Sequence, residues 1–385
     1  MTTSAKTFLQ NFQNFYFSKA TFYSLKHSNI LEFVKNLKKI KVKKIGVSFL
    51  GKDIFLLKKG SGNEKIIIWS QMHGNEPLST LATLDFIMFL EKNISPEFNK
   101  LLENNITLYF IPMLNPDGAD LFTRRNAQGI DINRDAIRKT SPEAQILSNT
   151  IDTIKPKYAF NLHDQEIYYG NSLTEYPTTL SFLAPAFDKQ KTIDNNRLIS
   201  MQIIGYIIEN LPMLKGKIAK YNDTFMPMAF GDNTQKKGIR TILFEGGYIP
   251  EDKNREKVRK WYAFSIFLAI EAIALKAFSP KHTTLYSNLP LNIKDLFFEY
   301  ILKNINIQKF NKIYSTDIGI RYPKINDEDF AAPNTDLIIA DIGDLSFYNA
   351  FKTIDCQSIT IKNKNNAIKK YAKANFLLNI CLKNI

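Results

Sequence analysis

Apolar residues follow two alternating patterns over residues 45–278. Short, nearly unbroken apolar runs that are typical of strands occupy residues 45–50, 54–57, 65–70, 107–112, 157–162 and 239–244. Between them, apolar positions repeat at helical spacing over residues 77–90 and 143–154, and again from about residue 251. Unbroken runs suit strands that are buried on both faces. Strands that alternate with helices predict an α/β fold, in which helices flank a mixed, mostly parallel sheet.

The pattern changes after residue 278. Pro280 and Pro290, together with several Ser, Thr and Asn residues, indicate a linker over residues 278–292. Beyond it, short runs of strand type are bounded by turn residues, at 318–322, 337–342, 358–362 and 375–378. We therefore expect a large α/β domain over residues 1–285 and a small β-rich domain of unknown role over residues 286–385.

The basic composition does not predict a nucleic-acid partner. The net charge of +14 comes from 51 Lys and Arg residues against 37 Asp and Glu residues, and Lys is spread along the chain without a basic block that alternates with aromatics. The arginines are distributed differently. None precedes Arg124, and then Arg124, Arg125, Arg134 and Arg138 follow closely. In a Lys-rich chain this cluster suggests a need for planar guanidinium groups.

Cysteine usage and hydropathy indicate the compartment. Cys356 and Cys381 are the only cysteines, so neither a disulfide framework nor a Cys-based zinc site is expected. The first 22 residues lack the continuous apolar core of a signal peptide. The most apolar helix candidate, 261–278, is interrupted by Glu271 and Lys276 and is too short to span a bilayer. We expect a cytoplasmic protein without a membrane partner.

Polar residues with ligand chemistry follow three of the predicted strands. His73 follows the run 65–70, His163 follows 157–162, and Glu245 follows 239–244, while Glu76 lies three residues after His73. In an open α/β sheet, ligands bind outside the carboxyl ends of the strands. Two histidines and one carboxylate form a zinc site whose fourth position stays open for water. His73, Glu76 and His163 are therefore the predicted zinc ligands.

Five motifs occur in a specific order: His-Gly-Asn-Glu at 73–76, Asn-Pro-Asp-Gly at 115–118, Asp-Ile-Asn-Arg at 131–134, Asn-Leu-His at 161–163 and Phe-Glu at 244–245. In this order they make residues 45–278 similar to the zinc carboxypeptidase family of the carboxypeptidase A type. The resemblance implies zinc ligation by His73, Glu76 and His163. It also implies roles in catalysis and substrate binding: base catalysis by Glu245, polarisation of the scissile carbonyl by Arg124, and recognition of a terminal carboxylate by Asn133 and Arg134.

Amide hydrolysis requires the same residue types. Zinc polarises a carbonyl and lowers the pKa of bound water, and a carboxylate such as Glu245 can then accept the proton. A guanidinium stabilises the developing oxyanion or holds a carboxylate with two hydrogen bonds. Asp131 is the expected partner that orients the His73 ring. Two further candidates for the substrate pocket are Tyr221 and Asp232, and Asp232 would favour a cationic side chain.

Three functions are compatible with the sequence, and the first of them is our prediction. The first is a carboxypeptidase that removes one C-terminal residue from a peptide. The second is a deacylase of the aspartoacylase or succinylglutamate desuccinylase type, which cleaves N-acyl amino acids and has similar motifs around its zinc ligands. Either substrate carries a free carboxylate. The third is a binding module that kept the fold and lost the chemistry; the presence of every ligand and of the base disfavours it.

Overall fold

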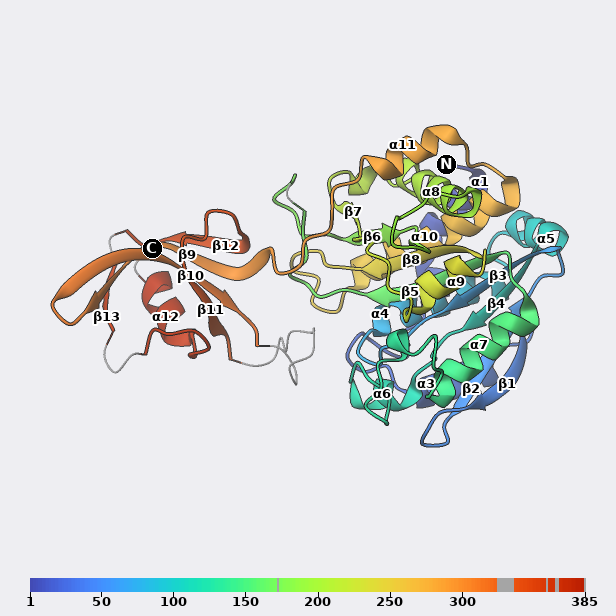
Figure 1. The fold of residues 1–385 in the computed structure, drawn as a ribbon, viewed down its shortest axis with the longest axis horizontal. Helices are drawn as coiled ribbons and strands as arrows, with labels where there is room; N and C mark the ends of the chain where they lie inside the picture. Colours follow the sequence, from blue (N-terminus) through green and yellow to red (C-terminus); the bar gives the residue numbers. More distant parts are fainter. Residues whose placement is uncertain (172, 324–335, 358, 364–366, 384–385) are drawn as a thin grey trace. The chain divides into compact units, whose positions relative to one another are not determined.

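The computed structural model describes residues 1–171, 173–323, 336–357, 359–363 and 367–383. The chain forms two compact units (Figure 1). Unit 1 comprises Met1–Gln165 and Thr178–Asn292, and unit 2 comprises Glu166–Pro177 and Ile293–Ile385. In the described part of the chain, no helix has both the length and the hydrophobicity needed to cross a membrane.

The predicted linker over residues 278–292 contains a helix, α11 (Pro280–Ser287), which packs on helix α8 (Asn195–Glu209) of unit 1. Ser279 and His282 form a capping box in which the Ser279 N–H donates to His282 Nδ1 at 2.9 Å. Pro280 occupies the first helical turn, where a missing N–H has no cost. The expected domain boundary, between residues 285 and 286, falls inside this helix, whereas the compact units divide after Asn292.

An eight-stranded mixed sheet forms the centre of unit 1, with the strand order β1-β2-β4-β3-β5-β8-β6-β7. The bounds are β1 Lys41–Val47, β2 Asp53–Lys59, β3 Glu64–Trp69, β4 Ile106–Ile111, β5 Tyr158–Asp164, β6 Leu180–Leu183, β7 Ile218–Lys220 and β8 Arg240–Gly246. The pairs β4–β3, β3–β5, β5–β8 and β6–β7 are parallel, whereas β1–β2, β2–β4 and β8–β6 are antiparallel. The predicted fold class is confirmed.

Helices cover both faces of this sheet (Figure 1). Their bounds are α1 Thr3–Gln10, α2 Phe12–Phe15, α3 His27–Lys35, α4 Pro77–Glu91, α5 Pro96–Asn105, α6 Pro116–Leu121, α7 Pro142–Ile154, α8 Asn195–Glu209, α9 Phe230–Lys236 and α10 Glu256–Leu275, with 3₁₀ turns η1 Ile132–Arg134 and η2 Pro212–Leu214. One face packs against α7 and α9, because Trp69 and Ala159 share a core cluster with Leu147 and Phe230. Helices α4, α8 and α10 pack together on the opposite face.

The Asn-Pro-Asp-Gly segment has the residue types of a turn, but it begins helix α6. Asn115 is its N-cap and accepts the Gly118 N–H at 2.9 Å, because a turn-forming Asn also satisfies the first free amide groups of a helix. A Cβ added to Gly74 would lie 2.0 Å from the Gly118 carbonyl carbon. The backbone of the His-Gly-Asn-Glu loop is therefore in direct contact with the backbone of α6.

Unit 2 is β-rich, as predicted. Its sheet has the order β11-β10-β9-β12, and β13 pairs with β9. The bounds are β9 Phe297–Lys309, β10 Lys312–Arg321, β11 Ile338–Gly343, β12 Asn349–Asp355 and β13 Thr360–Lys362, with helix α12 at Asn375–Lys383. The strand predicted at 375–378 was wrong, since this run begins α12, whose Leu377, Leu378 and Cys381 enter the core at helical spacing. Residue 358 of the predicted run 358–362 lies outside the described residues.

A buried ion pair joins helices α4 and α10 of unit 1 to the N-terminal segment. Arg259 Nε and Nη2 donate to the two carboxylate oxygens of Asp85, each at 2.6 Å, and both side chains are fully buried. The main chain of Phe17 binds both members of the pair. Its N–H donates to Asp85 at 2.7 Å, and its carbonyl accepts from Arg259 at 2.7 Å.

We expect Arg259→Met to lower the free energy of unfolding by about 3–5 kcal/mol, because Asp85 would keep a buried charge without its partner. The matched control is the double variant Asp85→Leu/Arg259→Met, which leaves no unpaired charge and should be clearly more stable than the single variant. Urea unfolding of the metal-free proteins measures both. Equal losses in the two variants would contradict this account of the pair.

Candidate metal centre

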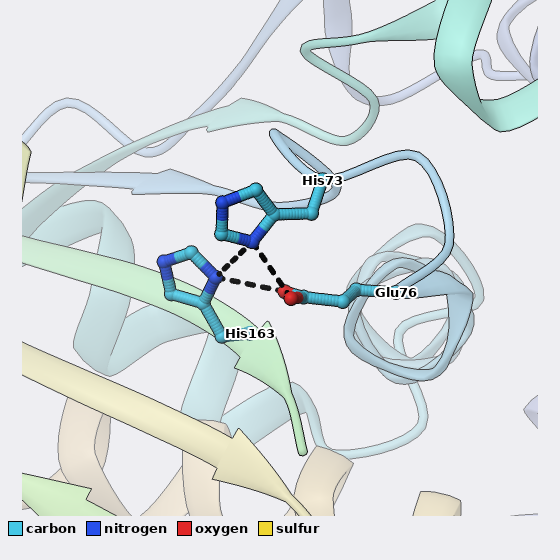
Figure 2. Close-up of side chains that lie close together, drawn as sticks. All are labelled: His73, Glu76 and His163. Carbon is cyan, nitrogen blue, oxygen red and sulfur yellow. Dashed lines mark hydrogen bonds and ion pairs between the residues drawn. The ribbon is translucent and has the colours of Figure 1, made fainter. Parts of the chain in front are cut away.

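His73, Glu76 and His163 meet at the carboxyl ends of β3 and β5 (Figure 2). His73 Nδ1 lies 2.7 Å from Glu76 Oε1, and His163 Nδ1 lies 2.8 Å from Glu76 Oε2. The two Nδ1 atoms are 3.2 Å apart. All three side chains are buried, and no other group of three or more His, Cys, Asp or Glu side chains with this spacing occurs among the described residues.

Strand and helix ends bring these side chains together. His73 and Glu76 lie within the short loop between β3 and α4, and Glu76 is the N-cap of α4. His163 lies within β5 itself, one residue before the strand ends, whereas the sequence placed it just after the strand. Since β3 and β5 are adjacent parallel strands, both ends point to the same edge of the sheet.

Asp164 holds this arrangement together, and the sequence did not predict its role. Its carboxylate accepts the N–H groups of Leu78 and Ser79, at 2.6 and 2.8 Å, and thereby joins the start of α4 to β5. Burial and the nearby Glu76 charge raise the pKa of Asp164 to about 8, although these two amide groups act in the opposite direction. Its position directly after His163 was the available signal, but the role depends on Leu78, which lies 86 residues earlier at the start of α4.

The contacts of His73 test whether a metal ion fits. His73 Nε2 lies 3.0 Å from Asp131 Oδ1, so Asp131 accepts the Nε2 proton and the Nδ1 lone pair faces the Glu76 carboxylate. A lone pair that faces a carboxylate at this distance requires a proton or a cation nearby. Burial would lower the pKa of His73, yet the Glu76 charge and the Asp131 hydrogen bond raise it. Two convergent imidazole nitrogens and a carboxylate suit Zn²⁺.

Arg124 borders the centre, whereas the adjacent Arg125 does not. The Arg124 guanidinium donates from Nε to Asp131 Oδ2 at 3.2 Å and from Nη1 to Glu76 Oε1 at 3.3 Å. Arg125 is exposed, and its Nη1 donates to the Gly129 carbonyl at 3.1 Å. Of the two arginines, only Arg124 therefore contacts the predicted ligand shell.

Glu245 lies on β8 directly opposite His163 in the parallel β5–β8 register. Burial raises the pKa of Glu245 well above its ordinary value, and the charges of Glu76 and Asp164 raise it further. Arg124 acts in the opposite direction. A carboxylate in this environment binds protons more strongly than one in water, which is a property of general bases.

The predicted carboxylate-binding residues lie in turn η1. Asn133 Oδ1 accepts the Phe230 N–H at 2.9 Å, and Asn133 Nδ2 lies 3.4 Å from His163 Nε2. Asn133 thus connects the metal centre to the start of helix α9. Arg134 is exposed, and its Nη1 donates to the Asn133 carbonyl at 2.8 Å. Because the side chain is exposed, its other guanidinium donors are accessible to a ligand.

Asp232 and Tyr221 are the two further candidates for the substrate pocket. Asp232 lies in the first turn of α9, where its carboxylate accepts the Met226 N–H at 2.8 Å. Burial raises the pKa of Asp232 to about 6. The Tyr221 N–H donates to the Phe182 carbonyl at 3.0 Å, next to the β6–β7 pair. Substrate binding by either side chain stays a prediction.

Comparisons with known proteins show what the chain is similar to. Residues 30–166 match the family model for zinc carboxypeptidase. No curated protein matches the chain. Carboxypeptidase A from Helicoverpa armigera is 16% identical, with a TM-score of 0.50 over 71% of this chain and 82% of that protein. Thrombin-activatable fibrinolysis inhibitor is 14% identical, with a TM-score of 0.53 over 74% and 80%. At these identities the structural likeness shows the fold.

The matched segment contains His73, Glu76 and His163, and the family it matches implies zinc at such a site. The resemblance is therefore confirmed over residues 30–166, which match the zinc carboxypeptidase model and contain four of the five motifs, and the fold of the chain is similar to that of a carboxypeptidase A.

Proposed function

We propose that the protein is a zinc-dependent carboxypeptidase that removes the C-terminal residue of a peptide. One observation carries the proposal: the predicted ligands His73, Glu76 and His163 lie within hydrogen-bonding distance of one another, and Glu245 and Arg124 border them. Two histidines and a glutamate would hold zinc, which polarises the scissile carbonyl and lowers the pKa of water when it is bound.

Side chains of the protein carry out the remaining steps of catalysis and substrate binding. Glu245 accepts a proton from the attacking water and returns it to the amine that leaves. Arg124 offers its guanidinium to the negative charge that develops on the carbonyl oxygen, and Asp131 fixes the His73 ring through Nε2. Asn133 and Arg134 hold the substrate's terminal carboxylate and thereby place the last peptide bond at the centre.

Arg134→Lys tests the carboxylate clamp. Lys keeps the charge but has no planar fork, so a site with two parallel hydrogen bonds should lose affinity. We expect the ratio of kcat/KM for a peptide with a free C-terminus to that of its amidated form to fall about tenfold or more. Arg125→Lys is the matched control, because Arg125 is adjacent in sequence but binds the Gly129 carbonyl, and its ratio should not change.

An unchanged ratio in Arg134→Lys would mean that Arg134 is not the carboxylate anchor. The deacylase alternative also needs a clamp, so a second measurement separates the two hydrolases. The zinc-loaded protein is incubated with a mixture of peptides and N-acyl amino acids, and the products are identified by mass spectrometry. Shortened peptides support the proposal, whereas free acids from N-acyl amino acids alone would replace it with the deacylase.

A further inference from the structure

Asn161 is a buried side chain whose hydrogen-bonding groups lack protein partners. It lies in β5, two residues before His163, and is 1% exposed. Neither Nδ2 nor Oδ1 has a hydrogen-bond partner in the described part of the chain. The same holds for Trp69 Nε1 and Gln235 Nε2. An unpaired buried amide destabilises a fold, so its presence points to a partner that the protein itself does not supply.

These three side chains belong to one region, in which helix α9 carries Gln235 and the sheet beneath it carries Trp69 and Asn161. Trp69 and Asn161 are directly paired in the parallel β3–β5 register, so their side chains lie side by side on the same sheet face. Helix α9 packs over β5 and β8, and Gln235 follows Gly231 by one helical turn. A Cβ added to Gly231 would lie 3.4 Å from Asn161 Nδ2, an ordinary contact distance. Room for a methyl-sized group therefore remains between Gly231 and the amide.

This region adjoins the metal centre. His163 is on the same face of β5 as Asn161, because side chains two positions apart share a face. Asn133, which lies beside His163, binds the Phe230 N–H, and Phe230 immediately precedes Gly231. If Asn133 and Arg134 hold a substrate's terminal carboxylate, the side chain of that terminal residue is the ligand group that can approach the Asn161 amide.

From these contacts we infer that Asn161 recognises the side chain of the substrate's terminal residue, and that this side chain carries a carboxamide, as in Asn or Gln. The inference rests on the proposed function. The unpaired atoms comprise three donor nitrogens and one acceptor oxygen. A carboxamide can accept from the donors and donate to Asn161 Oδ1. A hydrocarbon would leave both kinds of group unpaired, and a carboxylate could accept from the donors but has no hydrogen to donate to Asn161 Oδ1.

Asn161→Leu tests the inference, because Leu has nearly the same shape and no hydrogen-bonding groups. The substrates are two benzoyl-glycyl dipeptides that end in Gln or in Met, which have side chains of similar length. We expect the parent to prefer the Gln substrate in kcat/KM by about tenfold or more, and Asn161→Leu to lose this preference. Gly231→Ala fills the space beside the amide, so it should reduce the preference for Gln without a clash in the fold.

Thermal unfolding gives a readout that does not depend on turnover. Free glutamine should raise the Tm of the zinc-loaded parent more than free methionine does, and Asn161→Leu should abolish this difference. Without ligand, Asn161→Leu should be at least as stable as the parent, because it removes an unpaired buried amide. A lower Tm together with an unchanged Gln-to-Met ratio would overturn the inference, since the amide would then serve the fold through buried water.

Failure of the proposed function gives a different result. If the parent hydrolyses no peptide but glutamine still raises its Tm through Asn161, the binding inference stands and the catalytic proposal falls. If the parent hydrolyses Met-ended and Gln-ended peptides equally well, the catalytic proposal stands and the role of Asn161 falls.

Discussion

Replacing His163 with Ala should remove zinc from the protein, because only two protein ligands then remain and a catalytic zinc site uses three. His73→Ala should do the same, and peptide turnover should fall to background in both variants. The measurement is the zinc content per chain after dialysis, by elemental analysis. Full occupancy in either variant would contradict the ligand assignment.

The matched control for this experiment is His282→Ala. His282 is also a buried histidine of unit 1, but its Nδ1 accepts the Ser279 N–H and its Nε2 lies 3.0 Å from Glu209. Its loss should affect the start of α11 and leave the zinc content per folded chain unchanged. A loss of zinc in His282→Ala as well would indicate general unfolding in place of ligand removal.

Glu245→Gln should keep the metal and lower kcat by about a hundredfold or more, because the amide has a similar shape but cannot accept the proton of the attacking water. Glu271→Gln is the control, since Glu271 is a buried carboxylate of α10 that accepts a hydrogen bond from Tyr206 at 3.1 Å, and turnover should be unchanged. Near-normal turnover in Glu245→Gln would rule out its role as the base.

The pH profile gives a second test of Glu245. Burial, Glu76 and Asp164 raise its pKa, so the deprotonated form that catalysis needs appears at higher pH than for an ordinary carboxylate. The activity kcat/KM should therefore rise with pH, with a midpoint above the usual range of glutamate but shifted back toward that range by the bound cation. The residual activity of Glu245→Gln should lack this rise.

The placement of the site at the sheet edge could be predicted because it follows from chain order and strand direction. His73 follows a buried strand, His163 and Glu245 each lie one residue before the end of one, and parallel neighbours must bring those ends together. Asp164 and Asn161 could not be predicted in this way. The role of Asp164 depends on where α4 begins, and that of Asn161 on what lies beneath α9, so both require the packed structure.

The errors in the predicted fold also have physical causes. Asn-Pro and Ser-Pro sequences favour turns, but the same residues cap helices and occupy their first turn, and this ambiguity concealed α6 and α11. Periodicity alone could not distinguish a strand from a helix in the short run at 375–378. In the structure this segment is a helix that buries its apolar residues in the core of unit 2.

The contact between Gly74 and Gly118 determines how precisely the metal centre is built. A contact between side chains can relax through a change of rotamer, but a contact between two main chains cannot. The loop that carries His73 and Glu76 is therefore positioned by the rigid start of α6, whatever side chains fill the surrounding core. The core can vary in sequence while the donor atoms keep their positions, which catalysis by a bound ion requires to within about half an ångström.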